Sequence, residues 1–342
     1  MKMRDRFRRL AGIALAASAF TAMSTMAVNA QDFYQGKRLT IVIGNTAGSG
    51  YDTYGRLVSR YVSKHLAGQP GQIFQYLPGA GSLRAAEFMY ALAPKDGTHI
   101  GVVIPGALVD PLFTDSLRQR YDPTKFEYMG TADSGARLCF SLAASQAKTM
   151  KDVQSREFIV GATQPGAYAR LLNSLAKTKF KIVTGYPGAN EMFMALDLAE
   201  SDIICGLDYS AVNTLRPGFL TSGKANVFIQ IGLEPKPALT AMGVPSIWEF
   251  IEPADKPLVE LIVTEQIFQR VFLLPPGTPA DRVALLRAAF DKAMEDPELL
   301  SDAKKLELEI NPKSGEYVAD HVKKLYAAPK DLVERMAKVI RP

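Results

Sequence analysis

Two glycine-rich turns near the N-terminus carry groups that can bind an anion. One follows the apolar run 39–43, the other follows the run 73–76, and each comes directly before a segment with helical periodicity. The N–H groups at the start of a helix are unpaired and lie at the positive end of the helix dipole. These turns are therefore predicted to bind a carboxylate, through Gly48, Ser49, Gly50 and Tyr51 in the first and Ala80, Gly81 and Ser82 in the second.

Several side chains beside these turns have different predicted roles. Ser49 adds a hydroxyl to the backbone donors, and Tyr51 can close over a ligand or stack on an aromatic one. Asp52 would repel a bound carboxylate, so we interpret it as a helix cap or an organiser of the loop. Arg84 lies in the first turn of the second helix, and a solvated surface position is favoured over contact with the ligand.

Two further turns follow the apolar runs 157–161 and 181–184. Both precede helical periodicity, so they are predicted to complete the same site from the other side. Hydroxyl and amide side chains in the third turn can bind the far end of a ligand. For one residue of the fourth turn, Asn190, a plain helix N-cap is an equally good explanation. The predicted contacts are Thr163, Gln164, Gly166 and Ala167 in the third turn, and Tyr186 and Asn190 in the fourth.

Two charged residues accompany these turns. Asp208 follows the run 202–206 and is expected at the same rim, where it can accept from a ligand hydroxyl, an ammonium group or an ordered water. Arg137 precedes the run 138–143. If Arg137 faces the ligand it can clamp a carboxylate in bidentate fashion, and the alternative is an exposed arginine near a hinge.

The elements that position these residues alternate between strands and helices. Such alternation indicates α/β sheets covered by helices on both faces. Ligands of such sheets bind beyond the carboxyl ends of the strands, and four turns in two groups suggest two lobes around one cleft. Strands are predicted at 39–43, 73–76, 99–103, 127–131, 138–143, 157–161, 181–184, 202–206, 226–231 and 269–274.

The predicted organisation is a two-lobed α/β fold with two parallel or mixed sheets and a hinge. Lobe 1 is expected to comprise 31–133 plus 230–342, and lobe 2 to comprise 134–229. The C-terminal part reads as helical, with helices over 281–294 and 297–306 and one long helix from Ser314 to about Ile340.

The first thirty residues have the pattern of a signal peptide. A basic stretch with five Lys or Arg precedes an apolar stretch, and Val28-Asn29-Ala30 resembles a cleavage site. With one Asp, residues 1–30 carry +4 of the formal net charge of +5, which leaves about +1 for the rest. A nucleic-acid partner is therefore not expected, and the mature protein is predicted to be periplasmic.

The two cysteines, Cys139 and Cys205, both lie in apolar strand-like runs. A disulfide is allowed in an oxidising compartment. The sequence does not show whether the two residues are close enough, and two buried free thiols are the favoured expectation.

Enzymatic chemistry finds little support in the sequence. The first turn lacks the G-x-G-x-x-G spacing of a dinucleotide site, and no serine stands in a G-x-S-x-G elbow. The three histidines, His65, His99 and His321, form neither a triad nor a metal-ligand pattern. We expect no catalytic residues, no metal and no cofactor.

The ordered set of motifs resembles the receptors of tripartite tricarboxylate transporters, the Bug family, over nearly all of 31–342. The motifs that carry the resemblance are residues 33–43, the loop ending in Gly48-Ser49-Gly50-Tyr51-Asp52, Arg56, residues 77–81 with Ala85 and Ala86, residues 93–98, residues 163–166, residues 185–188 and Pro245.

The resemblance implies a periplasmic, non-enzymatic binding protein that delivers a small mono- or dicarboxylate to a two-component inner-membrane permease. We expect a monomer, and a receptor that signals through a membrane partner is the alternative. The sequence departs from the family pattern at Gly44, Ser49, Tyr51 and Gln164. These positions belong to the predicted ligand-binding turns, so the resemblance does not identify the ligand.

Overall fold

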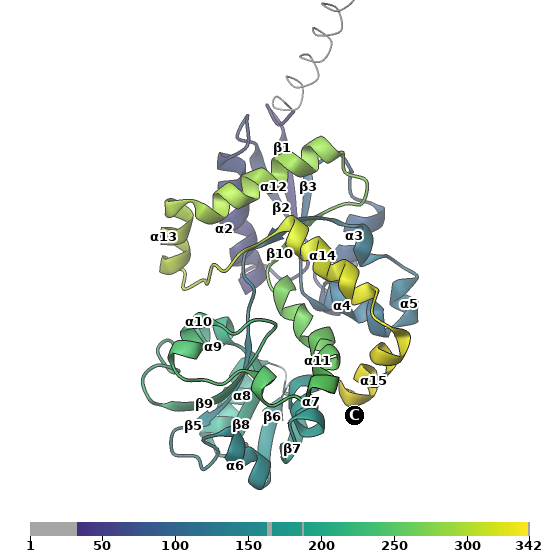
Figure 1. The fold of residues 1–342 in the computed structure, drawn as a ribbon. Helices are drawn as coiled ribbons and strands as arrows, with labels where there is room; N and C mark the ends of the chain where they lie inside the picture. Colours follow the sequence, from purple (N-terminus) through teal and green to yellow (C-terminus); the bar gives the residue numbers. More distant parts are fainter. Residues whose placement is uncertain (1–32, 163–165, 187, 341–342) are drawn as a thin grey trace, which may run out of the picture.

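The computed structural model describes residues 33–162, 166–186 and 188–340, and it contains two β-sheets, each flanked by helices (Figure 1). The predicted signal peptide, residues 1–30, lies outside the described residues. Among the described helices, none combines the length and the apolar character that a membrane crossing requires.

The first sheet has the order β11-β4-β10-β3-β1-β2. The strands β1, β2 and β3 are parallel, whereas β10 runs antiparallel between β3 and β4, and β11 pairs antiparallel with β4. The strand bounds are β1 (Arg38–Ile43), β2 (Gly71–Tyr76), β3 (His99–Val103), β4 (Glu127–Thr131), β10 (Val271–Leu274) and β11 (Lys313–Ser314).

The second sheet has the order β7-β6-β8-β5-β9. Here β6, β7 and β8 are parallel, and β5 runs antiparallel to both β8 and β9. Both sheets are therefore mixed. The bounds are β5 (Arg137–Leu142), β6 (Phe158–Ala162), β7 (Phe180–Thr184), β8 (Ile203–Asp208) and β9 (Ala225–Ile231).

Helices cover both faces of each sheet, as Figure 1 shows for α2, α12 and α13 on one side of the first sheet and α3, α4 and α14 on the other. The helix bounds are α2 (Gly50–Lys64), α3 (Leu83–Ala91), α4 (Gly106–Phe113), α5 (Asp115–Arg118), α6 (Met150–Ser155), α7 (Ala167–Leu175), α8 (Ala189–Asp197), α9 (Tyr209–Leu215), α10 (Pro237–Ala241), α11 (Lys256–Val263), α12 (Ala280–Glu295), α13 (Pro297–Lys305), α14 (Gly315–Tyr326) and α15 (Lys330–Ile340). Short 3₁₀ helices are η1 (Ala80–Ser82), η2 (Pro123–Lys125), η3 (Ile247–Glu249), η4 (Pro253–Asp255) and η5 (Thr264–Phe268).

Every strand predicted from the sequence is present, with ends displaced by at most two residues. The two-residue strand β11 was not predicted. The prediction of one long C-terminal helix is wrong, because the chain breaks between α14 and α15. Pro329 lies at this break; it has no N–H to donate and disfavours helical backbone at Ala328.

One hydrophobic core runs through both halves of the molecule. It joins Val42 and Val103 of the first sheet to Val160 and Ile203 of the second, by way of buried residues of α4, α7, α11 and α15. Helix α15 packs against α7, α11 and α4. The halves are therefore in direct apolar contact along this side, where α11 and α15 lie in Figure 1.

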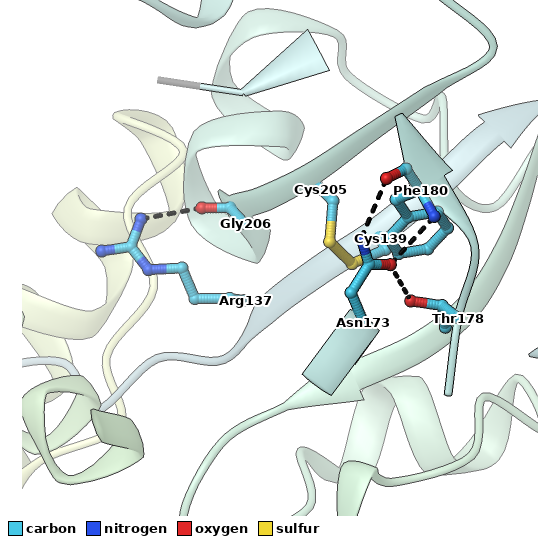
Figure 2. Close-up of a disulfide and its surroundings, with 7 residues drawn as sticks. All are labelled: Arg137, Cys139, Asn173, Thr178, Phe180, Cys205 and Gly206. Carbon is cyan, nitrogen blue, oxygen red and sulfur yellow. Dashed lines mark hydrogen bonds between the residues drawn. A yellow bond between two sulfur atoms is a disulfide. The ribbon is translucent and has the colours of Figure 1, made fainter. Parts of the chain in front are cut away.

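Cys139 and Cys205 form a disulfide between neighbouring antiparallel strands (Figure 2). The residues are register partners on β5 and β8, and their Cα atoms lie 4.0 Å apart. The expectation of two free thiols is therefore wrong. The expectation failed because strand order in the sheet differs from strand order in the sequence. The strands β6 and β7 come between the two cysteines in sequence, but β8 pairs with β5 in the sheet.

The disulfide is predicted to stabilise the second sheet. It closes a loop with a sequence separation of 66 residues, so its loss frees the unfolded chain. We expect Cys139→Ala/Cys205→Ala to lower the free energy of unfolding by about 2–4 kcal/mol, measured by denaturant titration. The wild-type protein in reductant should shift in the same direction. Equal midpoints for oxidised, reduced and double-variant protein would contradict the prediction.

Candidate functional site

The first predicted turn is organised by Asp52. Its Oδ2 accepts from the N–H of Gly48 at 2.8 Å, and its Oδ1 accepts from Arg56 Nε at 2.8 Å and the Tyr76 hydroxyl at 2.9 Å. Ser49 is the N-cap of α2, with its Oγ accepting from the N–H of Asp52 at 3.3 Å. The organising role of Asp52 is confirmed. The N–H of Gly48, predicted to bind the ligand, is instead used inside the loop.

The second turn is held by Ser82. The backbone from Gly79 to Ser82 has four consecutive positive φ angles, of 124°, 47°, 62° and 72°. The Ser82 hydroxyl is buried, donates to the carbonyl of Gly44 at 2.8 Å and accepts from the N–H of Ile104 at 3.1 Å. The Ser82 side chain therefore joins the ends of β1 and β3, and the predicted contact of this turn with a ligand stays a prediction. Ala80 and Gly81 are exposed beside it.

Arg84 fits the solvated alternative. It is exposed, and its Nη1 donates to the carbonyl of Pro78 at 3.2 Å. The side chain therefore folds back on its own turn.

The third and fourth turns belong to the second sheet. Thr163 and Gln164 lie outside the described residues. Gly166 is the buried N-cap of α7 with φ 73°, and the half-buried Ala167 follows it as the first helical residue. Tyr186 is half-buried. Asn190 is exposed at the second position of α8, whose N-cap is Gly188, so the N-cap explanation for Asn190 is wrong.

Arg137 lies inside the molecule, which excludes the exposed-hinge alternative. Only 21% of its side chain is exposed. Its Nη1 lies 3.3 Å from Asp208 Oδ2. The same nitrogen donates to the carbonyl of Gly206 at 3.0 Å, a hydrogen bond that Figure 2 shows. Its Nη2 lies 3.4 Å from Glu265 Oε1, and its guanidinium stands 5.3 Å from the centre of the Tyr168 ring. Arg137 therefore already has two carboxylate partners.

A segment that the sequence analysis overlooked supplies the centre of this cluster. Glu265 and Gln266 belong to η5, between α11 and β10. Glu265 accepts from the Tyr168 hydroxyl at 2.5 Å, and Gln266 Nε2 donates to that hydroxyl at 2.5 Å. Gln269 Nε2 donates to Gln266 Oε1 at 2.9 Å. These polar contacts connect the segment just before β10 to α7, which packs on the second sheet.

Arg270 completes the cluster and lies at the start of α2. A Cβ built on Gly50 would be 3.9 Å from Arg270 Nη2. The guanidinium stacks on Tyr51 and Tyr54, at 4.6 and 4.8 Å from the ring centres, and Nη1 donates to the carbonyl of Gln269 at 2.8 Å. Its Nε is buried and has no hydrogen-bond partner among the described residues, and none of their carboxylates forms a salt bridge with Arg270.

Three other buried atoms near this centre also lack a hydrogen-bond partner in the described part of the chain: Arg137 Nε, Asp208 Oδ1 and Asp133 Oδ1. Buried polar atoms are almost always paired, so these atoms have hydrogen-bonding capacity that the described side chains do not use. Burial raises the pKa of Tyr51 to about 12, opposed by Arg270 and Arg137 and assisted by Asp208 and Glu265, so its phenol is protonated at neutral pH. Tyr51 lies beside Arg270, and its predicted contact with a ligand stays a prediction.

The segment between β4 and β5 lies beside the cluster. The N–H of Ser134 donates to the carbonyl of Asn311 at 3.0 Å, and that of Gly135 to the carbonyl of Gln266 at 3.1 Å. Asp133 is 1% exposed, and burial raises its pKa to about 7, with Lys236 and Arg270 opposing and Glu309 and Asp208 assisting.

A cavity of about 160 Å³ adjoins this segment. Ser134, Gly135, Lys236, Gln266 and Lys313 are among its lining residues. Among the described residues, no group of three or more His, Cys, Asp or Glu side chains is arranged to hold a metal ion.

Solved structures share this fold over almost their whole length. A TctC solute-binding protein from Polaromonas has a TM-score of 0.68 and 17% identity, over 88% of this chain and 99% of that one. The fold is that of the TctC and Bug periplasmic solute-binding proteins. MatC from Rhodopseudomonas palustris with bound malate has a TM-score of 0.58 and 21% identity, covering 89% and 99% of the two chains. The R. palustris protein Rpa4515 with adipate has a TM-score of 0.62 and 19% identity, covering 89% and 97%.

The periplasmic binding protein BugD, at a TM-score of 0.60, belongs to the same set of neighbours. The resemblance seen in the motifs is thereby confirmed at the level of the fold. No family model matches the sequence. No curated protein matches it either.

Replacing Ser82 should affect stability. In Ser82→Ala, the buried carbonyl of Gly44 and the N–H of Ile104 both lose their partner. We expect a loss of about 1–3 kcal/mol in the free energy of unfolding, measured by denaturant titration. Ser49→Ala, which removes a half-buried cap, is the comparison and should cost about 0.5–2 kcal/mol. An unchanged stability of Ser82→Ala would mean that the hydroxyl is not structural.

Asp133 should make stability depend on pH. Because its folded pKa of about 7 lies above that of an unfolded aspartate, the folded state binds more protons between these values. The contribution of Asp133 to the free energy of unfolding is therefore greatest below pH 4 and is lost as the pH rises towards 7. We therefore expect Asp133→Asn to gain stability relative to wild type from pH 4 to pH 8, measured by thermal unfolding. If the difference in melting temperature between Asp133→Asn and wild type does not change with pH, the raised pKa of Asp133 is contradicted.

Proposed function

We propose that the protein is an extracytoplasmic receptor that binds a small mono- or dicarboxylate between its two sheets and delivers it to a tripartite tricarboxylate-type permease. The proposal includes export by the signal peptide at 1–30, lobes comprising 31–133 plus 230–342 and 134–229, a monomeric state and no catalytic activity. The neighbours that hold malate and adipate support a carboxylate ligand.

The observation that carries the proposal is Arg270. A guanidinium that is largely withdrawn from water normally has a carboxylate partner, because leaving such a charge unpaired is costly. Arg270 is half-buried, and its Nε is fully buried. Arg137, in the same cluster, has two such partners, and Arg270 has none among the described residues. Since Arg270 also lies at the N-terminal turn of α2, the helix dipole and the guanidinium favour an anion at the same place.

The contacts around this place come from both sheets. Tyr51 and Arg270 belong to the first half, whereas Arg137, Tyr168 and Asp208 belong to the second. A ligand bound here would contact both halves. It would bind the closed arrangement more tightly than the open one, and this difference in affinity would stabilise the closed arrangement. A permease would then recognise the closed receptor.

Arg270 is predicted to be essential for binding. A screen of aliphatic and aromatic carboxylates by thermal shift identifies a ligand, because binding to the folded state raises the melting temperature. For that ligand, we expect Arg270→Gln to weaken affinity at least about 30-fold by calorimetry, as loss of a buried charge partner costs about 2–5 kcal/mol. Arg270→Lys, which keeps the charge without the planar fork, should weaken it less.

Arg84→Gln is the matched control. This exposed arginine lies near the second turn, and its Nη1 donates to the carbonyl of Pro78, so its replacement should leave affinity unchanged. Trp248, the only tryptophan, donates to the carbonyls of Gly232 and Leu233 beside β9, so its fluorescence provides a second readout. Wild-type affinity in a folded Arg270→Gln variant would overturn the proposed site.

A further inference from the structure

The two halves of the molecule also meet through charged side chains. Lys236 forms an ion pair with Glu309, and only 11% and 25% of these two side chains are exposed. Glu234 lies 2.9 Å from Lys313 Nζ and accepts from the Tyr317 hydroxyl at 3.2 Å. These five residues are called the latch below. Lys236 directly precedes α10, which lies on the opposite side of the molecule from α15 in Figure 1.

The loop that carries Lys236 is attached to the second sheet. The buried side chain of Gln230 in β9 accepts from the N–H of Lys236 at 2.7 Å and donates to the carbonyl of Val244 at 2.8 Å. Leu239 of α10, which follows the loop, belongs to the same apolar cluster as Phe140 of β5. We therefore count this loop with the second half, beyond the boundary proposed for the lobes.

The other three latch residues belong to the first half. The strand β11, which begins with Lys313, pairs with β4 of the first sheet. The carbonyl of Glu309 accepts from the Tyr54 hydroxyl of α2 at 2.8 Å. Tyr317 lies in α14, which packs against β4. Each of the two ion pairs therefore joins one half of the molecule to the other.

Two prolines restrict the backbone that presents the charges of the loop. The loop reads Glu234-Pro235-Lys236-Pro237. Because a proline ring fixes φ near about −65°, the chain around both charges has few alternative conformations. Less conformational entropy is then lost when the ion pairs form. The Nζ of Lys236 also lies 5.1 Å from the centre of the Tyr209 ring, which helps to place it.

A cavity separates the halves beside the latch. It measures about 160 Å³, and its lining includes Lys236 and Lys313 of the latch together with Ser134 and Gln266 of the segments that connect the halves. Atoms that line a void lack packing partners on that side, so the charged contacts replace apolar packing here. One partly exposed ion pair changes an equilibrium by up to about fivefold, enough to matter between two arrangements of similar free energy.

We propose that the latch holds the two halves in the arrangement seen here and thereby sets the fraction of unliganded protein that is ready to bind. In this arrangement Tyr51 of the first half lies near Arg137 and Asp208 of the second, so the candidate site is assembled. The effect on binding rests on the proposed receptor function. Loss of the latch lowers the binding-competent fraction, and the apparent affinity falls in proportion.

The first test measures the separation of the halves without a ligand. Spin labels are attached through Ala241→Cys in α10 and Lys304→Cys in α13, two exposed positions in different halves, and pulsed EPR gives their distance distribution. Cys139 and Cys205 are joined in the disulfide and do not take the label. We expect Lys236→Met/Glu309→Gln to increase the population outside the wild-type distance at least about threefold.

Lys324→Met/Asp320→Asn is the matched control. This pair, with Lys324 Nζ 2.7 Å from Asp320 Oδ2, lies within α14, so its loss should leave the distance distribution unchanged. Far-UV circular dichroism and the melting temperature establish that each variant folds.

Salt provides a second measurement, on protein whose latch is intact. Raising NaCl from about 0.02 M to about 1 M screens partly exposed ion pairs and should shift the distribution in the same direction as Lys236→Met/Glu309→Gln. The salt response of that variant should be smaller, because one of the two pairs is already absent.

Binding is then measured by calorimetry with malate and adipate, the ligands held by two of the solved neighbours, and with any carboxylate found by the thermal-shift screen. We expect Lys236→Met/Glu309→Gln to weaken the affinity at least about threefold, although these side chains lie outside the candidate site. The control variant Lys324→Met/Asp320→Asn should bind as the wild type does.

The outcomes separate this inference from the receptor function. An unchanged distance distribution in Lys236→Met/Glu309→Gln overturns the latch, whether or not a ligand is found. A changed distribution with equal or tighter binding overturns its role in affinity and leaves the receptor function standing. If the distribution changes but no carboxylate binds even the wild-type protein, the latch is supported and the proposed function fails.

Discussion

The half-buried position of Arg270, with a buried Nε and no acidic partner among the described residues, is the constraint on which the proposed site depends. The chain places this guanidinium directly before β10, a strand whose four residues are all buried. Stacking on Tyr51 and Tyr54 and a bond to the carbonyl of Gln269 offset part of the cost of its desolvation. The rest of the desolvation cost remains as long as the guanidinium has no anionic partner. An anion bound at the start of α2 would remove it, so this cost would contribute to the affinity for an anion.

A second constraint is the continuous core through α11 and α15. Because α15 packs on α7 as well as on α11 and α4, the two halves are joined by apolar contacts on one side of the molecule. These apolar contacts therefore limit any separation of the halves on this side. Glu265 is well placed to couple the two, since it follows α11 closely and contacts Arg137 and Tyr168 of the second half.

The fold was largely predictable because its signals are local. Each predicted strand is an apolar run bounded by Gly, Pro or polar residues, and each was found within two residues of its predicted ends. The role of Asp52 was predictable for the same reason, since its partners Gly48 and Arg56 lie four residues away on either side. The break at Pro329 also had a local signal, but the continuous helical periodicity on both sides obscured it.

The errors concern contacts between segments distant in sequence. Ser82 bonds to residues at the ends of β1 and β3, and the disulfide depends on the order of strands in the sheet. Neither the bonds of Ser82 nor the disulfide can be recognised from hydrophobic periodicity in the sequence. For Arg137 the sequence analysis weighed a ligand clamp against an exposed arginine, and it missed the two acidic partners, Asp208 and Glu265, which lie 71 and 128 residues further along the chain.

Arg270 is the instructive case, because the sequence does contain a signal for it. The predicted strand 269–274 began with Gln269 and Arg270, whereas the observed strand begins at Val271. A cation within a strand expected to be buried on both faces contradicts that assignment unless something compensates its charge. Two explanations can resolve this contradiction. Either the strand begins after Arg270, or the arginine is withdrawn from water because it binds an anion. The structure shows the first, and the position of Arg270 at the N-terminal turn of α2 favours the second as well.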